Sequence, residues 1–360
     1  MIRLASIIEK FQNEFFGQYR DQLLPSHLAT LNAIIQCRSD AAPKMRLKCQ
    51  SCDHEHYLPH SCGNRNCPHC QAHESQQWIE KQQAKLVPGQ YYLLTFTLPA
   101  EFREVAYAHQ RIVYASLFRC AWETIQQFSQ NDKILQGMPS ATVVLHTHSR
   151  RLDYHPHVHL LMPATAINTS TNELNKKTGD FLFSQKALAV VFRAKMLETL
   201  TASGIDLPAR HPKKWIVHCK KVGNGKKTIV YLGRYLYRGV IQEKNIVACE
   251  NGNVTFRYED STTKIMKTRT VSGVEFIRML LMHVLPKGFR RARNFGFLHS
   301  NSKWLSVVQL VLKIVSTVVA QIKPAIKCSH CGGVMKIVET RIPALKRTIQ
   351  SCVAMESVIM

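Results

Sequence analysis

Three histidines occupy alternate positions in the stretch YHPHVHLLMP, where an apolar run begins: His155, His157 and His159. Residues two apart on a β-strand point to the same face, so these imidazoles would lie together while Val158 and Leu160 face the other way. Imidazole is a common ligand of divalent cations, so this spacing predicts a metal-ligand pair. The alternative interpretation is a set of ordinary hydrogen-bonded histidines, and the rest of the sequence has to decide between the two.

Two further reactive side chains lie in YLGRYLYRG, where Tyr231 and Tyr235 are four residues apart. On a helix both would share one face, with Cβ atoms about 5 to 6 Å apart, whereas on a strand Tyr237 would join them. A phenol attacks a phosphate poorly unless a cation neutralises the phosphate charge, and a histidine-bound metal ion would do so. Both tyrosines are therefore candidate nucleophiles, and Gly233 between them is expected to loosen the turn. The alternative is that they are core aromatics.

Basic residues strongly outnumber acidic ones, with 48 Lys and Arg against 24 Asp and Glu, which leaves a net charge of +24 at pH 7. They are spread through HPKKW, CKKVGNGKK and PKGFRRAR instead of forming one tail, which suits a folded surface that follows a polyanion. Nucleic acid is therefore the first partner to consider. The alternative, a surface charged only for solubility, requires a much smaller imbalance.

The cysteines of CQSCDHEHYLPHSCGNRNCPHC form two Cys-x-x-Cys pairs: Cys49 with Cys52, and Cys67 with Cys70. Two such knuckles can surround one zinc ion with a tetrahedral thiolate shell, and Cys62 between them is an alternate ligand. Closed four-ligand sites are structural, so this module is expected to fold on its zinc and to present Arg65 to DNA.

The opening MIRLASIIEKFQNEFF carries charges throughout, unlike a secretory signal, and polar residues interrupt the most apolar later stretch at Gln309 and Lys313. We therefore expect a cytoplasmic bacterial protein without a membrane partner, associated with the nucleoid when bound to DNA. Its 12 cysteines should then be reduced, which favours metal sites over disulfides.

Apolar periodicity predicts a helical lead-in over residues 1–36, packed on the zinc module, and a long helix over roughly residues 101–130. ATVVLHTHS and HPHVHLLMP read as a strand hairpin, in which His146 and His148 could converge with the later histidines. Strands and helices mix without strict βαβ alternation. The predicted class is α+β, with an antiparallel sheet flanked by helices and preceded by a helical segment and a cysteine-rich module.

The motifs together resemble a known family. HVH preceded by Pro156 resembles the histidine-hydrophobe-histidine signature of HUH endonucleases, and the two tyrosines resemble their two-tyrosine variant. Five segments occur in the order seen in rolling-circle transposases of the IS91 family, over about residues 10 to 335: SCGNRNCPHCQ, TFTLP, LHTHSRRLDYHPHVHLLMP, YLGRYLYRGVI and HVLPKGFRRARNFGFL.

This resemblance implies an HUH-type sheet in which His157 and His159 bind Mg or Mn. Family members often have Trp at the position of His148, so His146 is the preferred third ligand. Tyr231 and Tyr235 would be the successive nucleophiles. Basic residues expected to contact DNA are Arg65, Arg234, Lys287, Arg290 and Arg291.

The implied function is a transposase that nicks single-stranded DNA at hairpin-forming element ends through a 5'-phosphotyrosine and transfers the strand by a rolling-circle route. A plasmid replication initiator or relaxase would share this chemistry. A non-enzymatic zinc DNA-binding protein would instead use the same histidines and tyrosines structurally. The target DNA sequence and the oligomeric state leave no signature in the sequence.

The expected division is a zinc-binding DNA-recognition domain over 1–90, a catalytic domain over 91–300 and a helical tail over 301–360. In that tail, KCSHCGG supplies only a partial zinc knuckle. Its cysteines and their candidate partners in a second zinc site are Cys328, Cys331, Cys352 and His330.

Overall fold

A five-stranded antiparallel sheet forms the centre of the computed structural model, which describes residues 1–237, 239–260, 262–312 and 325–343. Its strand order is β12-β4-β5-β3-β8. The strands are β3 (Tyr91–Thr97), β4 (Ser140–His148), β5 (Tyr154–Pro163), β8 (Val217–Lys221) and β12 (Ala292–Gly296). Every neighbouring pair is antiparallel, so the predicted α+β class with an antiparallel sheet is confirmed.

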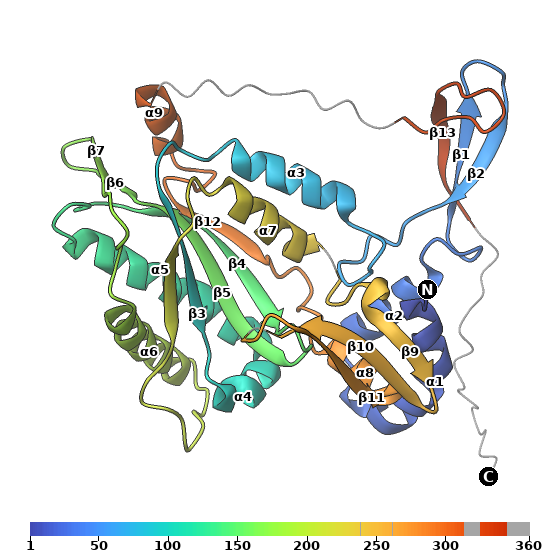
Figure 1. The fold of residues 1–360 in the computed structure, drawn as a ribbon, viewed down its shortest axis with the longest axis horizontal. Coiled ribbons are helices and arrows are strands. Elements are labelled where there is room, and N and C mark those ends of the chain that lie inside the picture. The colour runs from blue at the N-terminus through green and yellow to red at the C-terminus, as the bar shows by residue number, and fades with distance from the viewer. Residues whose placement is uncertain (238, 261, 313–324, 344–360) are drawn as a thin grey trace, which may run out of the picture.

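Helices cover both faces of this sheet (Figure 1). On one face lie α4 (Arg103–Ala108), α5 (Gln110–Asn131) and α6 (Gln185–Ala202), and on the other lie α3 (Ala72–Gln83) and α7 (Lys226–Tyr237). Alternation along β5 sends Val158 and Leu160, both fully buried, into the core with α5. His157 and His159, which alternate with them, therefore face α3 and α7.

A second core joins the amino-terminal helices to a later part of the chain. Its helices and strands are α1 (Leu4–Tyr19), α2 (Pro25–Gln36), β9 (Ile246–Glu250), β10 (Asn253–Glu259), β11 (Met266–Ser272) and α8 (Gly273–Leu281). Helix α8 begins at Gly273, where an added Cβ would lie 2.3 Å from the Phe11 ring of α1. The predicted lead-in therefore packs on residues 246–281 as well as on the cysteines Cys67 and Cys70.

A small three-stranded ribbon is built from an amino-terminal and a carboxy-terminal segment of the chain. Strand β1 (Lys44–Cys49) lies between β2 (Glu55–Pro59) and β13 (Met335–Ile342), and both pairings are antiparallel. The segment 301–360 was predicted to be a separate helical tail. Its strand β13 instead belongs to the same ribbon as β1 and β2 of the amino-terminal cysteine module. The stretch that contains Cys352 lies outside the described residues.

The remaining elements of the described chain do not belong to the central sheet. They are the β6–β7 hairpin (Thr165–Asn168 and Glu173–Lys176), α9 (Trp304–Val311) and three short 3-10 helices (Arg20–Gln22, Ala100–Phe102 and Glu243–Asn245). None of the helices in the described part of the chain is long and apolar enough to cross a bilayer.

Candidate functional site

The two central strands bring three histidines together. His146 on β4 pairs directly with His157 on β5, and His159 lies two residues further along the same face. The ring centroids of His146 lie 5.3 Å from His157 and 4.5 Å from His159. One ring nitrogen from each can be chosen so that all three lie within 4.8 Å of one another. The three predicted ligands therefore form one cluster.

Hydrogen bonds on the far side of two rings fix which nitrogen faces the cluster. His157 Nδ1 lies 2.7 Å from the His155 carbonyl oxygen, so it carries the proton and leaves Nε2 as a free lone pair. His159 Nδ1 can donate in the same way to Thr95 Oγ1 at 3.0 Å. His146 Nε2 is buried without a hydrogen-bond partner. This donor set fits a divalent cation.

The electrostatic surroundings keep these rings neutral. Burial, followed by the neighbouring histidines, lowers the pKa of both His146 and His157 well below the usual value. Burial also lowers the pKa of His159 to about 4. Since a metal ligand must be deprotonated, the cluster would bind a cation at neutral pH without first losing protons.

Two neighbouring histidines do not join this cluster. His148, which sequence reasoning placed near the others, turns toward His283, with ring centroids 5.3 Å apart. A register irregularity between His146 and His148 separates their positions along β4. His283 follows α8, and its Nε2 lies 3.2 Å from the Leu152 carbonyl oxygen. It was missed because HVLPKGF gives no pattern that points to this sheet.

The two tyrosines of α7 stand over the histidine cluster. Their ring centroids are 4.7 Å apart, and Tyr235 lies 5.1 Å from His146 while Tyr231 lies 6.3 Å from His159. The Tyr231 side chain is 39% exposed, so a substrate could reach it. Burial of the inner part of the ring and the neighbouring Tyr235 raise the pKa of Tyr231 to about 12. Tyr237 packs instead against the core beneath α7.

Close packing against α3 holds α7 in place. An added Cβ at Gly233 would lie 2.3 Å from Ile79 Cγ1, and Ser75 Oγ donates to the Gly233 carbonyl oxygen at 3.0 Å. The absence of a side chain at Gly233 therefore permits a tight contact between the helices, a packing role that the sequence did not indicate.

Arg291 lies inside the protein, not on a DNA-contacting surface as predicted. It is 8% exposed, and its guanidinium donates to the carbonyl oxygens of Leu145 on β4 (3.0 Å) and Leu236 on α7 (3.4 Å). Burial lowers its pKa to about 10, so it remains charged at neutral pH. Its role in the fold is to tie the end of the tyrosine helix to the histidine strand.

The four predicted zinc ligands fall into two different groups. Cys67 and Cys70 converge with Cys37 and Cys62, whereas the β1–β2 ribbon carries Cys49 and Cys52 away to Cys328 and Cys331. In the first group the closest Sγ pairs are Cys37–Cys70 (3.4 Å), Cys67–Cys37 (3.5 Å) and Cys62–Cys70 (3.6 Å).

Those separations are close to the roughly 3.8 Å edge of a tetrahedron with zinc–sulfur bonds of about 2.3 Å, so the first group fits a structural zinc ion. Cys62, predicted only as an alternate ligand, is a member of this group. Cys37, which comes directly after α2, was missed because it has no Cys-x-x-Cys partner. The cysteine count alone could have suggested a further ligand.

The first cysteine group is built against the helices beside the histidine site. Helix α3 begins at Ala72, two residues after Cys70, and runs beside α7 (Figure 1). An added Cβ at Gly239, just beyond α7, would lie 2.6 Å from the Asn66 carbonyl oxygen. Arg65 is exposed and also reaches the Phe289 carbonyl oxygen at 3.5 Å. The loop that carries Cys67 and Cys70 thus contacts the chain just beyond the end of the tyrosine helix, and the helix that follows the loop packs along its side.

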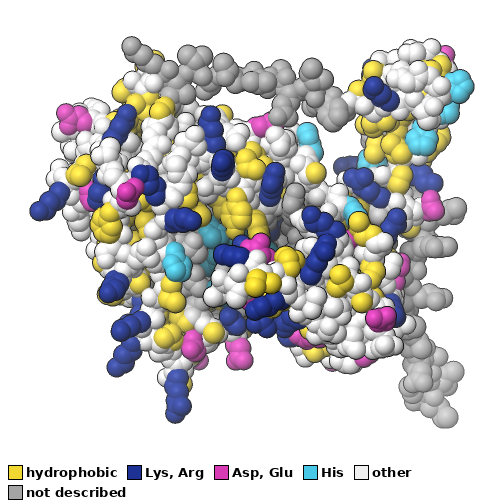
Figure 2. Space-filling model, in the orientation of Figure 1, with side chains coloured by type: hydrophobic (Ala, Val, Ile, Leu, Met, Phe, Trp, Pro, Cys, Tyr) yellow, Lys and Arg dark blue, Asp and Glu magenta, His cyan; other side chains and the backbone are white. Residues whose placement is uncertain are grey.

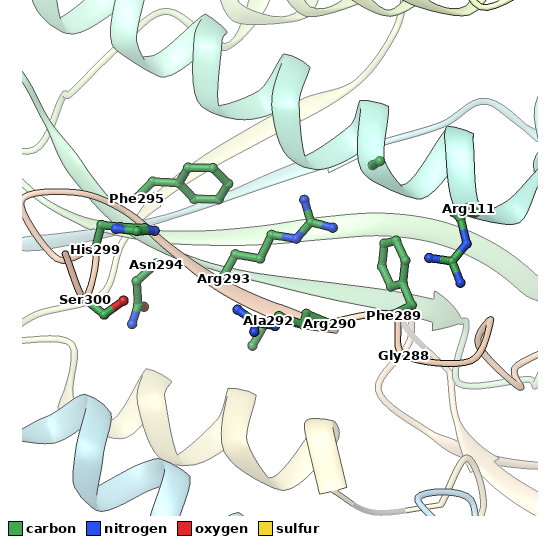
Figure 3. A pocket seen from close by; sticks show the side chains of 11 residues that line it. Arg111, Gly288, Phe289, Arg290, Ala292, Arg293, Asn294, Phe295, His299 and Ser300 are labelled. Atoms are coloured by element: carbon green, nitrogen blue, oxygen red, sulfur yellow. The ribbon is translucent and has the colours of Figure 1, made fainter.

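A basic groove of about 620 Å³ runs along β12, the outermost strand of the central sheet (Figure 3). Arg111, Arg290 and Arg293 line it together with two phenylalanines, and none of its lining residues is acidic. Arg111 also fixes the loop before β12 by donating to the Lys287 carbonyl oxygen at 2.7 Å.

Lys and Arg side chains are spread over the molecular face seen in Figure 2 and do not form a single patch. Of the remaining predicted DNA contacts, Lys287 and Arg234 are both exposed. The fold and the site together define a basic, zinc-binding protein in which a pair of tyrosines stands over a histidine cluster.

Comparisons with known proteins show where such a protein belongs. A family described as "putative transposase" matches residues 140–304, and one described as "transposase zinc-binding domain", of the IS91 type, matches residues 7–98. The chain belongs to the transposases of the IS91 family.

Two relatives match most of the chain. The protein named "Putative transposase y4qJ" of Sinorhizobium fredii is 30% identical over an alignment of 318 residues, and the match covers 82% of this chain and 80% of that protein. The transposase for insertion sequence element IS801 of Pseudomonas savastanoi pv. phaseolicola is 29% identical over an alignment of 308 residues, and the match covers 80% of this chain and 74% of that protein.

Proposed function

We propose that this transposase cuts single-stranded DNA at the ends of its element with Tyr231 or Tyr235 and keeps the cut strand as a 5'-phosphotyrosine. Strand transfer would then follow a rolling-circle route. The observation that carries the proposal is the placement of both tyrosine rings over the histidine cluster. The ring centroids of Tyr235 and His146 are 5.1 Å apart, and those of Tyr231 and His159 are 6.3 Å apart.

His146, His157 and His159 would hold Mg or Mn, which when bound neutralises charge on the scissile phosphate. The phenol oxygen of one tyrosine then attacks phosphorus and loses its proton to water. The bond between phosphorus and the 3' oxygen breaks, and that oxygen leaves as a 3'-hydroxyl after taking up a proton. One phosphodiester replaces another, so a later 3'-hydroxyl can reverse the step on a new strand without an energy source.

The two tyrosines support a transfer reaction over simple cleavage. A tyrosine esterified to DNA cannot attack again until a hydroxyl releases it. With ring centroids only 4.7 Å apart, the second tyrosine would reach the same metal while the first still holds a 5' end. One protein could therefore hold one DNA end and cut another.

The groove along β12 would hold part of the single strand. Its arginines would contact phosphates, and the half-buried Phe295 in its lining would add an apolar contact to a base. Exposed Arg65, Arg234 and Lys287 would add contacts that position the DNA without reading its sequence.

The deciding experiment is incubation of the full chain with labelled single-stranded DNA and Mn, followed by a denaturing gel. A covalent protein–DNA band that disappears in Tyr231→Phe/Tyr235→Phe is expected, with Tyr237→Phe as the matched control. DNA binding without any covalent band, on oligonucleotides that include the element ends, would instead favour the non-enzymatic interpretation.

A further inference from the structure

The second cysteine group joins residues from opposite ends of the chain. Cys49 Sγ lies 3.5 Å from Cys331 Sγ, and Cys52 Sγ lies 3.8 Å from Cys328 Sγ. All four sulfur atoms lie within 4.8 Å of one another, and all four residues are free cysteines. These separations match the edges of a tetrahedral zinc–thiolate site, which are about 3.8 Å.

The two Cys-x-x-Cys turns share a local geometry that prepares the sulfur atoms for a cation. The backbone amide of Ser51 donates to Cys49 Sγ, and the amide of His330 donates to Cys328 Sγ, each at 3.4 Å. The residue after each second cysteine has a left-handed backbone: Asp53 with φ 57° and Gly332 with φ 73°. Amide donors of this kind stabilise the thiolate form that binds metal.

The ribbon around this group has little apolar core of its own. Among its described residues, the buried apolar side chains besides cysteines are Leu47 and Met335, with Met45 and Leu58 partly buried beside them. A module this small cannot bury enough apolar surface to offset the ordering of three strands. It requires an additional cross-link, and a metal ion is the kind that four converging thiolates supply.

We propose that Cys49, Cys52, Cys328 and Cys331 bind a second structural zinc ion that fastens the carboxy-terminal strand β13 to the amino-terminal hairpin β1–β2. The matches to known families cover residues 7–98 and 140–304, so neither includes Cys328 or Cys331. Of the two partners expected from the sequence, His330 does not belong to this sulfur group, and Cys352 lies outside the described residues. The His330 ring stacks on His54 at 6.0 Å, outside the sulfur group.

A zinc ion at this site would hold together two segments that are far apart in the sequence, the β1–β2 hairpin and β13. The cross-linked residues are as much as 282 positions apart, and the entropy lost on closing a loop grows with its length. The pairing of Cys49 with Met335 places the metal directly at the end of the β1–β13 ladder. Loss of the ion should therefore separate β13 from β1 and leave the central sheet intact.

The first test counts zinc per chain by elemental mass spectrometry, on full-length protein purified without added Mg or Mn. A His157→Ala/His159→Ala background removes any contribution from the histidine cluster. We expect two zinc ions in this background, and one after either Cys328→Ser/Cys331→Ser or Cys37→Ser/Cys62→Ser. The matched control Cys219→Ser/Cys249→Ser, outside both groups, should keep two. Unchanged zinc in Cys328→Ser/Cys331→Ser would overturn the proposal.

A second test begins with a cobalt titration of the unaltered chain, which does not depend on how well a variant folds. Cobalt titrated into the metal-free, unaltered chain should give thiolate charge-transfer absorption that saturates at two ions per chain, and saturation at one would contradict a second site. Hydrogen exchange in Cys328→Ser/Cys331→Ser should then show lost protection in β1 and β13 but retained protection in β4 and β5. Retained protection in β1 would also contradict the proposal. Neither measurement depends on the proposed DNA chemistry.

Discussion

Gly233 on α7 and Ile79 on α3 lie so close that an added Cβ on the glycine would stand 2.3 Å from Ile79 Cγ1. Side chains do not approach to that distance, so any residue larger than glycine must displace the Ile79 side chain or one of the two helices. Because α7 carries both tyrosines, this contact sets the height of their rings above the histidines.

Gly233→Ala should therefore reduce formation of the covalent adduct, by up to about a hundredfold if the rings move by 1 Å. It should also lower the melting temperature, although alanine favours a helix over glycine by about 1 kcal/mol. Adding Ile79→Ala, which removes Cγ1, should recover part of the adduct. A melting temperature higher in Gly233→Ala than in the wild type would mean that helix propensity outweighs the close contact.

Replacement of the histidines should separate chemistry from DNA affinity. His146→Ala, His157→Ala and His159→Ala should each reduce adduct formation more than about a hundredfold, because each removes a donor to the cation. DNA affinity, measured by fluorescence anisotropy, should change little because phosphate contacts from Lys and Arg supply it. His148→Asn is the matched control. Adduct formation at the wild-type rate in all three variants would rule out this metal site.

Either Tyr231 or Tyr235 alone should be able to cut single-stranded DNA, but strand transfer should require both. Either Tyr231→Phe or Tyr235→Phe should still form some adduct with single-stranded DNA, because both rings face the histidine cluster. Transposition in cells should be lost in each, since only one DNA end can then be held. Formation of the adduct by the double variant, together with its loss in Tyr237→Phe, would mean that the nucleophiles are assigned incorrectly.

Zinc removal at the first cysteine group should affect both DNA binding and catalysis. Cys67→Ser should unfold the loop from which α3 starts, and α3 in turn holds α7 through the hydrogen bond from Ser75 Oγ to the Gly233 carbonyl oxygen. We expect both the affinity and the adduct yield at saturating DNA to fall. A full adduct yield at saturating DNA would show that the core folds independently of this zinc site.

Sequence patterns predicted the structure correctly where a single strand or a single turn determines it. The alternation of His157 and His159 with apolar residues predicted their common face, and the β4–β5 hairpin followed from two apolar runs and a basic turn. The tyrosine segment was ambiguous because its apolar residues fit both a helical and a strand period. Packing on α3 resolves it as a helix.

Contacts between distant segments could not be predicted in the same way. The division of the cysteines depends on β1 pairing with β13, more than 280 residues later, and Cys-x-x-Cys spacing carries no information about that pairing. Likewise PKGFRRAR indicated only positive charge. Alternation along β12 and the loop before it buries Arg291 and leaves its neighbour Arg290 exposed.

Replacement of these two adjacent arginines should therefore affect different quantities: DNA affinity for Arg290, and the rate of adduct formation at saturating DNA for Arg291. Arg290→Gln should weaken single-stranded DNA binding and reduce the slope of log affinity against log salt by about 0.7, as expected for one lost phosphate contact. At saturating DNA its adduct rate should equal that of the wild type. Arg119→Gln, exposed on α5 but outside the groove, is the matched control.

Arg291→Met should instead leave the salt slope unchanged and slow adduct formation at saturating DNA. The variant removes the donors to the carbonyl oxygens of Leu145 and Leu236, so the end of α7 is no longer fastened to the strand that carries His146. Two buried acceptors are then unsatisfied, at a cost of about 1–3 kcal/mol each, which should also appear as a lower melting temperature. If Arg291→Met changed the salt slope while Arg290→Gln slowed the saturated rate, the buried arginine would be the DNA contact and the groove along β12 would not hold the strand.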